Sequence, residues 1–266
     1  MSSRRAVLTE CAKRLRTYAG TLEGGGLRSI SQRVLQWADK VQADDFVNVV
    51  QDYKSFLDEF KREATQGDPK QVRIYEALKE ILESAKGKSI SLTQLDSIVQ
   101  PTRGAQQAVA QVIKSFQSKG LTIEQSFYGL CFAYLLMVEG VYDKVMRYLL
   151  AWCKWPVDIA ELPEKINPMM AELLKIGSYE VLFEDYHRRI RNSIAHANFW
   201  FDATLSMAIF DDVNPDDPND KFHCEKPYDK FVQTVVGLYS VLFLFQVALL
   251  MIIFVPVTLL EAKNAQ

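Results

Sequence analysis

The segment from Tyr186 to His196 gathers side chains that could act on a phosphodiester bond. Its sequence is Tyr-His-Arg-Arg-Ile-Arg-Asn-Ser-Ile-Ala-His. Arginine keeps its charge at every physiological pH and binds phosphate through a planar fork of N–H donors. Histidine has an ordinary pKa of about 6.5, so it can accept and release protons near neutrality. The segment therefore combines phosphate binding with proton transfer.

Helical spacing separates these polar side chains from an apolar face. Ser178 can cap a helix that runs to about Ala197. On a wheel of about 100° per residue, one arc is apolar and contains Phe183, Tyr186, Ile190, Ile194 and Ala197. The remaining arc contains His187, Arg188, Arg191, Asn192 and His196. A basic face of this kind is often only solvated, so catalysis and a solvated face are both open at this point.

The residue types fit cleavage of RNA in particular. A base removes the proton of the 2′-hydroxyl, which then attacks the neighbouring phosphorus. Positive charge stabilises the phosphorane, and an acid protonates the departing 5′-oxygen. This chemistry requires no metal, and the sequence has no cluster of metal ligands beside the segment. We therefore expect neither a metal nor another cofactor.

The run Arg191-Asn192-Ser193-Ile194-Ala195-His196 resembles the R-x4-H signature of the HEPN superfamily. A polar residue directly after the arginine is the common form of that signature. The resemblance extends over roughly residues 121–260, because an aromatic hairpin and a long apolar helix are expected after the motif. Nothing in residues 1–120 resembles a family in this way.

This resemblance implies an α-helical bundle that forms a homodimer and acts as a metal-independent endoribonuclease, in toxin–antitoxin, abortive-infection or CRISPR-linked defence. The R-x4-H residues meet across the dimer interface in such proteins. Arg191 would then bind the scissile phosphate, His196 would transfer protons and Asn192 would orient the substrate or its partners. The additional basic residues have no role in the family, and we expect them to bind flanking phosphates or to be solvated: His187, Arg188 and Arg189.

Composition excludes several classes of protein. Apolar residues make up 48% and charged residues 24% of the 266 residues, which is typical of a globular protein and not of a disordered or collagen-like chain. The net charge of −2 gives no overall field for a polyanion, so RNA has to be bound by a local basic patch. Four separated cysteines predict free thiols, and we expect a cytoplasmic protein without a secretory signal.

The predicted fold is mainly α, with an N-terminal helical region of unknown role in residues 1–120 and a HEPN-like helical bundle with a small β-hairpin in residues 121–266. The spacing of apolar residues and the Gly and Pro breaks predict the elements. The expected helices are Ala6–Tyr18, one from about Asp44 to Gly67, Val72–Leu82, one from Ser91 to Pro101, Gln107–Phe116, Ile123–Trp152, Met169–Lys175, the motif helix and Tyr228–Leu260. The hairpin is expected over Phe199–Phe210, and Asp211–Asp220, with five aspartates, is expected to be a solvated loop.

The last helix has two interpretations. Phe231–Leu260 has no charged side chain, and its length exceeds what is needed to cross a bilayer. A helix at the centre of a bundle would also be apolar all round. We favour the buried helix, because Ile123–Trp152 is equally apolar and needs a partner of similar length.

Three functions are therefore compatible with the sequence. The favoured one is an endoribonuclease of defence or toxin type that acts on RNA as a homodimer, with an antitoxin or regulatory partner as a further possibility. The second is a catalytically silent HEPN-like module that binds or regulates a partner. The third is a membrane-anchored effector that uses residues 231–260 as its anchor.

Overall fold

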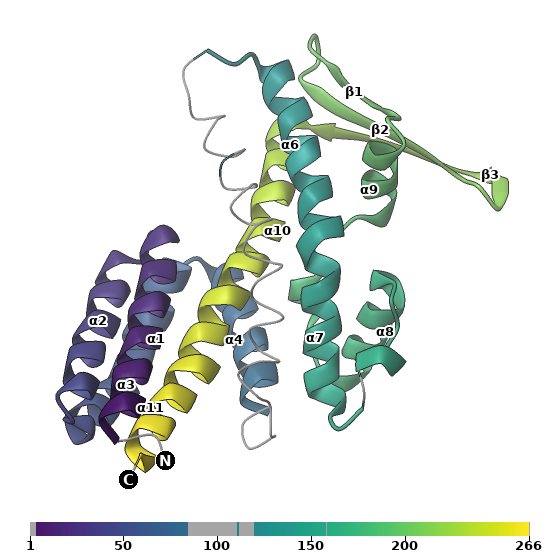
Figure 1. The fold of residues 1–266 in the computed structure, drawn as a ribbon. Coiled ribbons are helices and arrows are strands. Elements are labelled where there is room, and N and C mark those ends of the chain that lie inside the picture. The colour runs from purple at the N-terminus through teal and green to yellow at the C-terminus, as the bar shows by residue number, and fades with distance from the viewer. Residues whose placement is uncertain (1–3, 85–110, 112–119, 158, 266) are drawn as a thin grey trace. The chain divides into compact units, whose positions relative to one another are not determined.

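The computed structural model describes residues 4–84, 111, 120–157 and 159–265 (Figure 1). The helices expected between Ser91 and Phe116 lie outside the described residues. Contacts divide the chain into two compact units, one made of 1–88 with 243–266 and the other of 89–242. The domain boundary predicted at residue 120 instead places residues 243–266 with the HEPN-like bundle. The mainly α fold with a small β insert is confirmed.

The first unit is made of helices. They are α1 (Arg4–Gly24), α2 (Arg28–Gln42), α3 (Phe46–Thr65), α4 (Pro69–Ser84) and, from the end of the chain, α11 (Val255–Asn264) with the π-helical turn Leu250–Phe254 before it. Helix α2 was not predicted. Its buried residues Ile30, Val34, Trp37 and Val41 recur at helical spacing. The phenol of Tyr53 donates to the carbonyl of Met251 over 2.7 Å, which joins α3 to the C-terminal helix.

The helices of the second unit include one long helix in three parts. These are α6 (Ile123–Met137), a π-helical segment (Val138–Tyr142) and α7 (Asp143–Lys154). They confirm the predicted helix over Ile123–Trp152. Thr122 and Gln125 form a capping box at its start, with bonds of 3.1 and 3.0 Å. Short helices follow, and they are Ile159–Glu161, α8 (Ile166–Ile176), Glu180–Leu182 and α9 (Arg188–Ala195).

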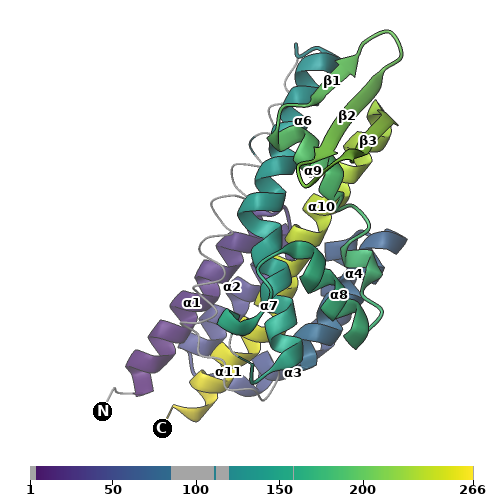
Figure 2. The same cartoon turned by 90° about the vertical axis from the view of Figure 1, so that its right-hand side faces the viewer.

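A three-stranded antiparallel sheet follows α9 (Figure 2). Its strands are β1 (Phe199–Asp202), β2 (Met207–Asn214) and β3 (Asp217–Pro227), in the order β1-β2-β3. The hairpin predicted over 199–210 is present. The loop expected over Asp211–Asp220 is wrong, because these residues end β2 and begin β3. The aspartates are compatible with strands because most of β3 is an exposed edge, where charged side chains face water.

Phe127 of α6 holds the helices and the sheet of the second unit together. Its fully buried ring lies between 5.5 and 6.1 Å, centroid to centroid, from four other rings of this unit. Those rings are Phe199 and Phe201 of β1, Phe210 of β2 and Phe231 of the following helix. This cluster fixes the sheet against α6, and α9 packs on both α6 and β2.

The C-terminal helix runs without a break from Tyr228 to Asn264 through α10 (Tyr228–Leu249), the π turn and α11. It is the one helix among the described residues that is long and apolar enough to cross a membrane, and 72% of its most apolar window is buried within the structure. Length and composition of this kind also fit a core helix. Pro256 lies within this continuous helix, because the π turn at 250–254 widens the helix where the proline ring would otherwise meet a carbonyl.

Candidate functional site

The helix with the R-x4-H motif is shorter than predicted. It begins at Arg188, whereas the sequence favoured a start at Ser178. Residues 180–182 form a separate 3-10 turn, and His187 is extended, with φ −124° and ψ 99°. The backbone N–H of His187 donates to the hydroxyl of Tyr134 over 2.8 Å. Because this hydrogen bond to α6 holds His187 in an extended conformation, α9 begins only at Arg188.

Two backbone bonds end α9 directly after the motif. Asn198 N–H donates to the carbonyl of Ser193 over 2.8 Å, and Ala197 N–H donates to Ile194 over 3.2 Å. This is the Schellman arrangement, in which the residue after the C-cap is left-handed and is usually glycine. Here that residue is Ala197, with φ 56°, and His196 is the C-cap. The turn places His196 at the open end of the helix.

Replacing Ala197 by glycine is expected to raise the free energy of unfolding by about 1 kcal/mol, because glycine has no Cβ to strain at positive φ. The matched variant is Ala195→Gly, two residues earlier and still helical. It should lower the free energy of unfolding by about 0.5–1 kcal/mol. Urea unfolding of both variants checks this, and two changes of the same sign would contradict the assigned turn.

Arg191 is held by acceptors on both sides of its guanidinium. Its Nε donates to Glu139 Oε1, and its Nη2 forms an ion pair with the same oxygen. Its Nη1 donates to Asn192 Oδ1 over 2.8 Å. Glu139 lies in the π-helical segment between α6 and α7, a type of segment that often occurs at functional sites. The guanidinium is therefore fixed in orientation while a third of the side chain stays exposed.

Asn192 continues this contact chain to the sheet. Its Nδ2 donates to Asp212 Oδ2 over 3.2 Å, and the same oxygen lies 2.7 Å from Arg189 Nε. Arg189 also donates from Nη1 to Asp220 Oδ2 over 2.8 Å. Asp212 is only 4% exposed, so this carboxylate is a buried link between α9 and β2. The network keeps Asn192 in place beside Arg191.

Removing the buried carboxylate by Asp212→Ala should lower the free energy of unfolding by about 1–3 kcal/mol, because Arg189 loses an ion-pair partner and Asn192 loses a hydrogen-bond acceptor. The adjacent Asp211→Ala is the control, since the carboxylate of Asp211 bonds to the ring of the exposed His223 rather than to the buried network. That variant should change the free energy by less than about 0.5 kcal/mol. If urea or thermal unfolding showed the same loss of unfolding free energy in both variants, the buried network around Asp212 would be refuted.

His196 is exposed and stands apart from the network. Its backbone N–H donates to the carbonyl of Asn192 over 2.9 Å, and within the described part of the chain its side chain has no hydrogen-bond partner. The structure thus brings Arg191 and Asn192 together, but not His196 with them. His187, Arg188 and Arg189 line a pocket at the opposite end of α9. The six predicted residues therefore occupy three places along one helix.

Sequence reasoning missed the partners of the motif, although two signals were present. Glu139 is the single charged residue between Gln125 and Tyr142, and an isolated acid in an apolar run needs a partner. Asp212 belongs to an acidic stretch that was assigned to solvent. Its burial follows from the alternation of β2, which turns Phe210 and Asp212 to the covered side. Among the described residues, no three His, Cys, Asp or Glu side chains are grouped so that they could hold a metal ion.

The R-x4-H run lies at the end of a short helix, directly before a small antiparallel sheet. Residues 165–248 match the family model described as HEPN pEK499 p136. The match includes α8, α9, the sheet and nearly all of α10. It supports the assignment to the HEPN superfamily, and the resemblance seen in the sequence is thereby confirmed. A HEPN domain indicates a nuclease, another RNA-related role or a regulatory role. The comparisons with curated proteins and with solved structures gave no match.

Proposed function

We propose that this protein is a metal-independent endoribonuclease of toxin or defence type that acts as a homodimer. The observation that supports it most is the fixed guanidinium of Arg191. Nη1 and Nη2 each carry two N–H groups, and each has at most one protein partner among the described residues. Both nitrogens thus retain an N–H for a phosphate oxygen. An arginine presented in this way matches the bidentate geometry of phosphate recognition.

The proposed reaction transfers one phosphoryl group within the RNA strand. The 2′-oxygen forms a bond to phosphorus as its proton passes to a base. The bond from phosphorus to the 5′-oxygen breaks, and that oxygen takes a proton from an acid. Arg191 stabilises the negative charge of the phosphorane, and His196 supplies proton transfer. The products are a 2′,3′-cyclic phosphate and a 5′-hydroxyl.

A second copy of the chain supplies the other proton-transfer group. Arg191 and His196 are five residues apart, which is about 140° on a helical wheel, so one chain does not turn both to the same side. Two chains related by a two-fold axis place two arginines and two histidines at one dimer interface. We propose that exposed aromatic rings of α6 form the dimer interface. Tyr128 and Phe132 are 41% and 56% exposed, and they precede Glu139 on the same long helix. Light scattering should give twice the chain mass; full activity of a monomer would refute this arrangement.

The ion pair between Arg191 and Glu139 favours one alternative. A paired arginine also fits a catalytically silent module that binds or regulates a partner. Expression in a bacterial host separates the two. A ribonuclease of toxin type slows growth, and the double variant Arg191→Ala/His196→Ala relieves that effect. Equal growth of cells with wild type and double variant would support the silent module.

The membrane-anchored effector is the other alternative, because the C-terminal helix has the length and composition of a span. We propose a cytoplasmic protein with a core helix instead, since most of that helix is buried against its own chain. Fractionation of cells without detergent tests the choice. Recovery in the membrane pellet, with release only by detergent, would favour the effector.

Cleavage by the purified protein is expected to be unchanged by excess EDTA and to leave a 2′,3′-cyclic phosphate. The reason is that the proposed chemistry uses only arginine and histidine. Mass spectrometry of the products of a defined RNA, with and without EDTA, is the measurement. Activity that disappears in EDTA and returns with Mg²⁺ would contradict the mechanism, as would products with a 3′-hydroxyl.

A further inference from the structure

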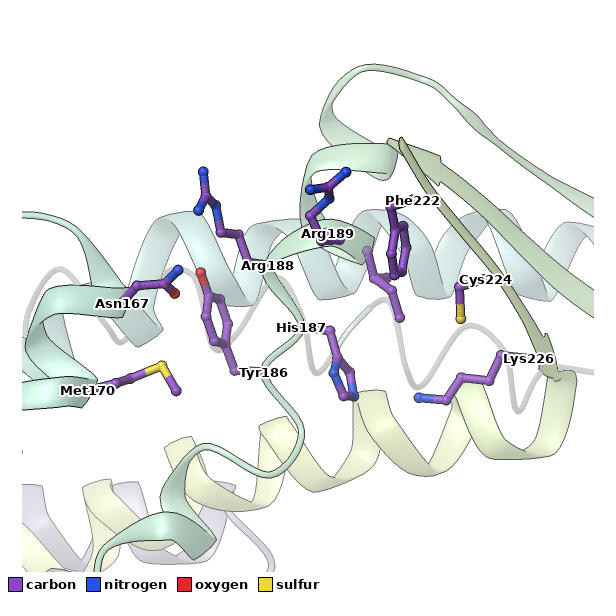
Figure 3. Close-up of a pocket in the computed structure, with 10 residues that line it drawn as sticks. Asn167, Met170, Tyr186, His187, Arg188, Arg189, Phe222, Cys224 and Lys226 are labelled. Carbon is purple, nitrogen blue, oxygen red and sulfur yellow. The ribbon is translucent and has the colours of Figure 1, made fainter. Parts of the chain in front are cut away.

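A pocket of about 390 Å³ opens at the N-terminal end of α9, within the second unit (Figure 3). Three segments line it. Asn167 and Met170 come from α8, Tyr186–Ile190 from the start of α9, and Phe222, Cys224 and Lys226 from β3. A volume of this size lies in the range of sites for small ligands, about 300–1,000 Å³. The pocket can hold one nucleotide and not a duplex.

The charge around the pocket is positive. Three of its lining residues are cationic and none is a carboxylate. Arg189 is neutralised by Asp212 and Asp220. Arg188 and Lys226, in contrast, form no ion pair with any residue that the structure describes. The pocket therefore has an excess of positive charge that an anion would balance.

Of the two cations without an ion pair among the described residues, Arg188 is exposed and Lys226 is half-buried. Its ammonium donates to the hydroxyl of Thr234 over 2.7 Å, and Figure 3 shows the side chain pointing along the pocket toward His187. Burial lowers the pKa of Lys226, and the nearby charge of Asp185 opposes that effect. A half-buried ammonium that donates to a hydroxyl and forms no ion pair with a described residue gains from binding an anion.

The N-terminus of α9 adds to the positive electrostatic potential of the pocket. The helix has no acidic residue in its first turn, and His187 at the N-cap provides no side-chain cap. A helix N-terminus without an acidic residue attracts anions through its N–H groups. Because Arg188, Arg189 and Ile190 all line the pocket, this end of α9 borders the cavity that Lys226 enters.

The other walls suit a planar ring. Tyr186, Phe222 and Met170 give apolar surface, and the ring of Tyr186 is fixed by stacking on Tyr142, 5.6 Å between centroids at 22°. The guanidinium of Arg189 lies 5.5 Å above the ring of Phe222. Bases of single-stranded RNA stack on such side chains without a strict sequence preference. Asn167 adds an amide that can bond to a base edge.

We propose that this pocket binds one nucleotide of the RNA strand next to the cleavage site, with Lys226 on its phosphate and its base between Tyr186 and Phe222. The inference rests on the proposed ribonuclease function and assigns Lys226, Asn167 and Phe222 to substrate binding. The axis of α9 connects the pocket to the motif. At 1.5 Å per residue, Arg188 and His196 are about 12 Å apart along that axis. A short run of single-stranded RNA spans this distance.

The test is the binding of a short single-stranded RNA whose riboses are all 2′-O-methylated, measured by fluorescence anisotropy at several salt concentrations. Such RNA cannot react through its 2′-hydroxyl, so binding is separated from cleavage. Lys226→Gln should weaken binding roughly tenfold and should reduce the slope of log affinity against log salt by about 0.7. Lys230→Gln is the matched control, because Lys230 is exposed and outside the pocket.

Two outcomes would overturn the proposal. In one, Lys226→Gln and Lys230→Gln bind the RNA with the same affinity and salt slope. In the other, Lys226→Gln weakens binding of adenosine 5′-monophosphate but not of the RNA, which would make the pocket a site for free nucleotides. A wild-type protein that binds the methylated RNA through Lys226 but does not cut unmodified RNA would contradict the ribonuclease proposal alone. Thermal unfolding of Lys226→Gln confirms that the variant is folded.

Discussion

Replacing His196 by alanine is expected to reduce RNA cleavage by about 10²–10⁴-fold, the range associated with general acid–base catalysis. Arg191→Ala should reduce it by about 10²–10³-fold, because the phosphorane loses its main source of positive charge. Both side chains are at least partly exposed, so both variants should remain folded. Initial rates on a defined RNA, together with circular dichroism, give the two readouts.

The controls use the same residue types at other positions. His223→Ala removes the exposed histidine of β3, which contacts Asp211 and Glu225 and not the motif. Its cleavage rate should match that of the wild type. Arg191→Lys keeps the charge but loses the planar fork, so its rate should fall between those of the wild type and Arg191→Ala. A His196→Ala protein that cuts at the wild-type rate would show that His196 has no catalytic role.

Truncation of Phe127 to alanine is expected to lower the free energy of unfolding by about 3–5 kcal/mol. The side chain is fully buried, and its ring contacts join α6 to two strands and to α10. The cavity would remove aromatic contacts at the centre of the second unit. Since domains are stable by only about 5–15 kcal/mol, the variant should be close to unfolding at 37 °C.

Urea unfolding measures this loss. Leu205→Ala is the control, because the side chain of Leu205 is 66% exposed in the turn between β1 and β2. Its free energy of unfolding should change by no more than about 0.5 kcal/mol. If Phe127→Ala unfolded at the same urea concentration as the control, the aromatic cluster would not be the core of this unit.

Helices and the first hairpin were accessible from sequence because their signals are local. Apolar periodicity identified the long helix from Ile123, the capping residue Thr122 agrees with it, and aromatic and branched residues identified β1 and the start of β2. The R-x4-H run identified the superfamily. These features depend on residues close to one another in the chain, which a single sequence displays directly.

The rest depended on tertiary contacts. α9 begins late because Tyr134, far away in the chain, binds the backbone of His187. β3 forms in an acidic stretch because β2 offers it an edge, and composition alone could not show that. Glu139 meets Arg191 and Lys226 meets the pocket only after folding. These missed residues surround the motif, which is where local patterns and the three-dimensional site differ most.

The central claim is attack by the 2′-hydroxyl at a phosphodiester held by Arg191. Its most direct test is the rate at which the wild-type protein cuts a short RNA at a mapped position when the single ribose that would attack is replaced by 2′-deoxyribose. The proposed mechanism predicts that cleavage at that position stops, while a 2′-deoxyribose placed two nucleotides away leaves it unchanged. Cleavage of the substituted position at the rate of the unmodified RNA would contradict the mechanism.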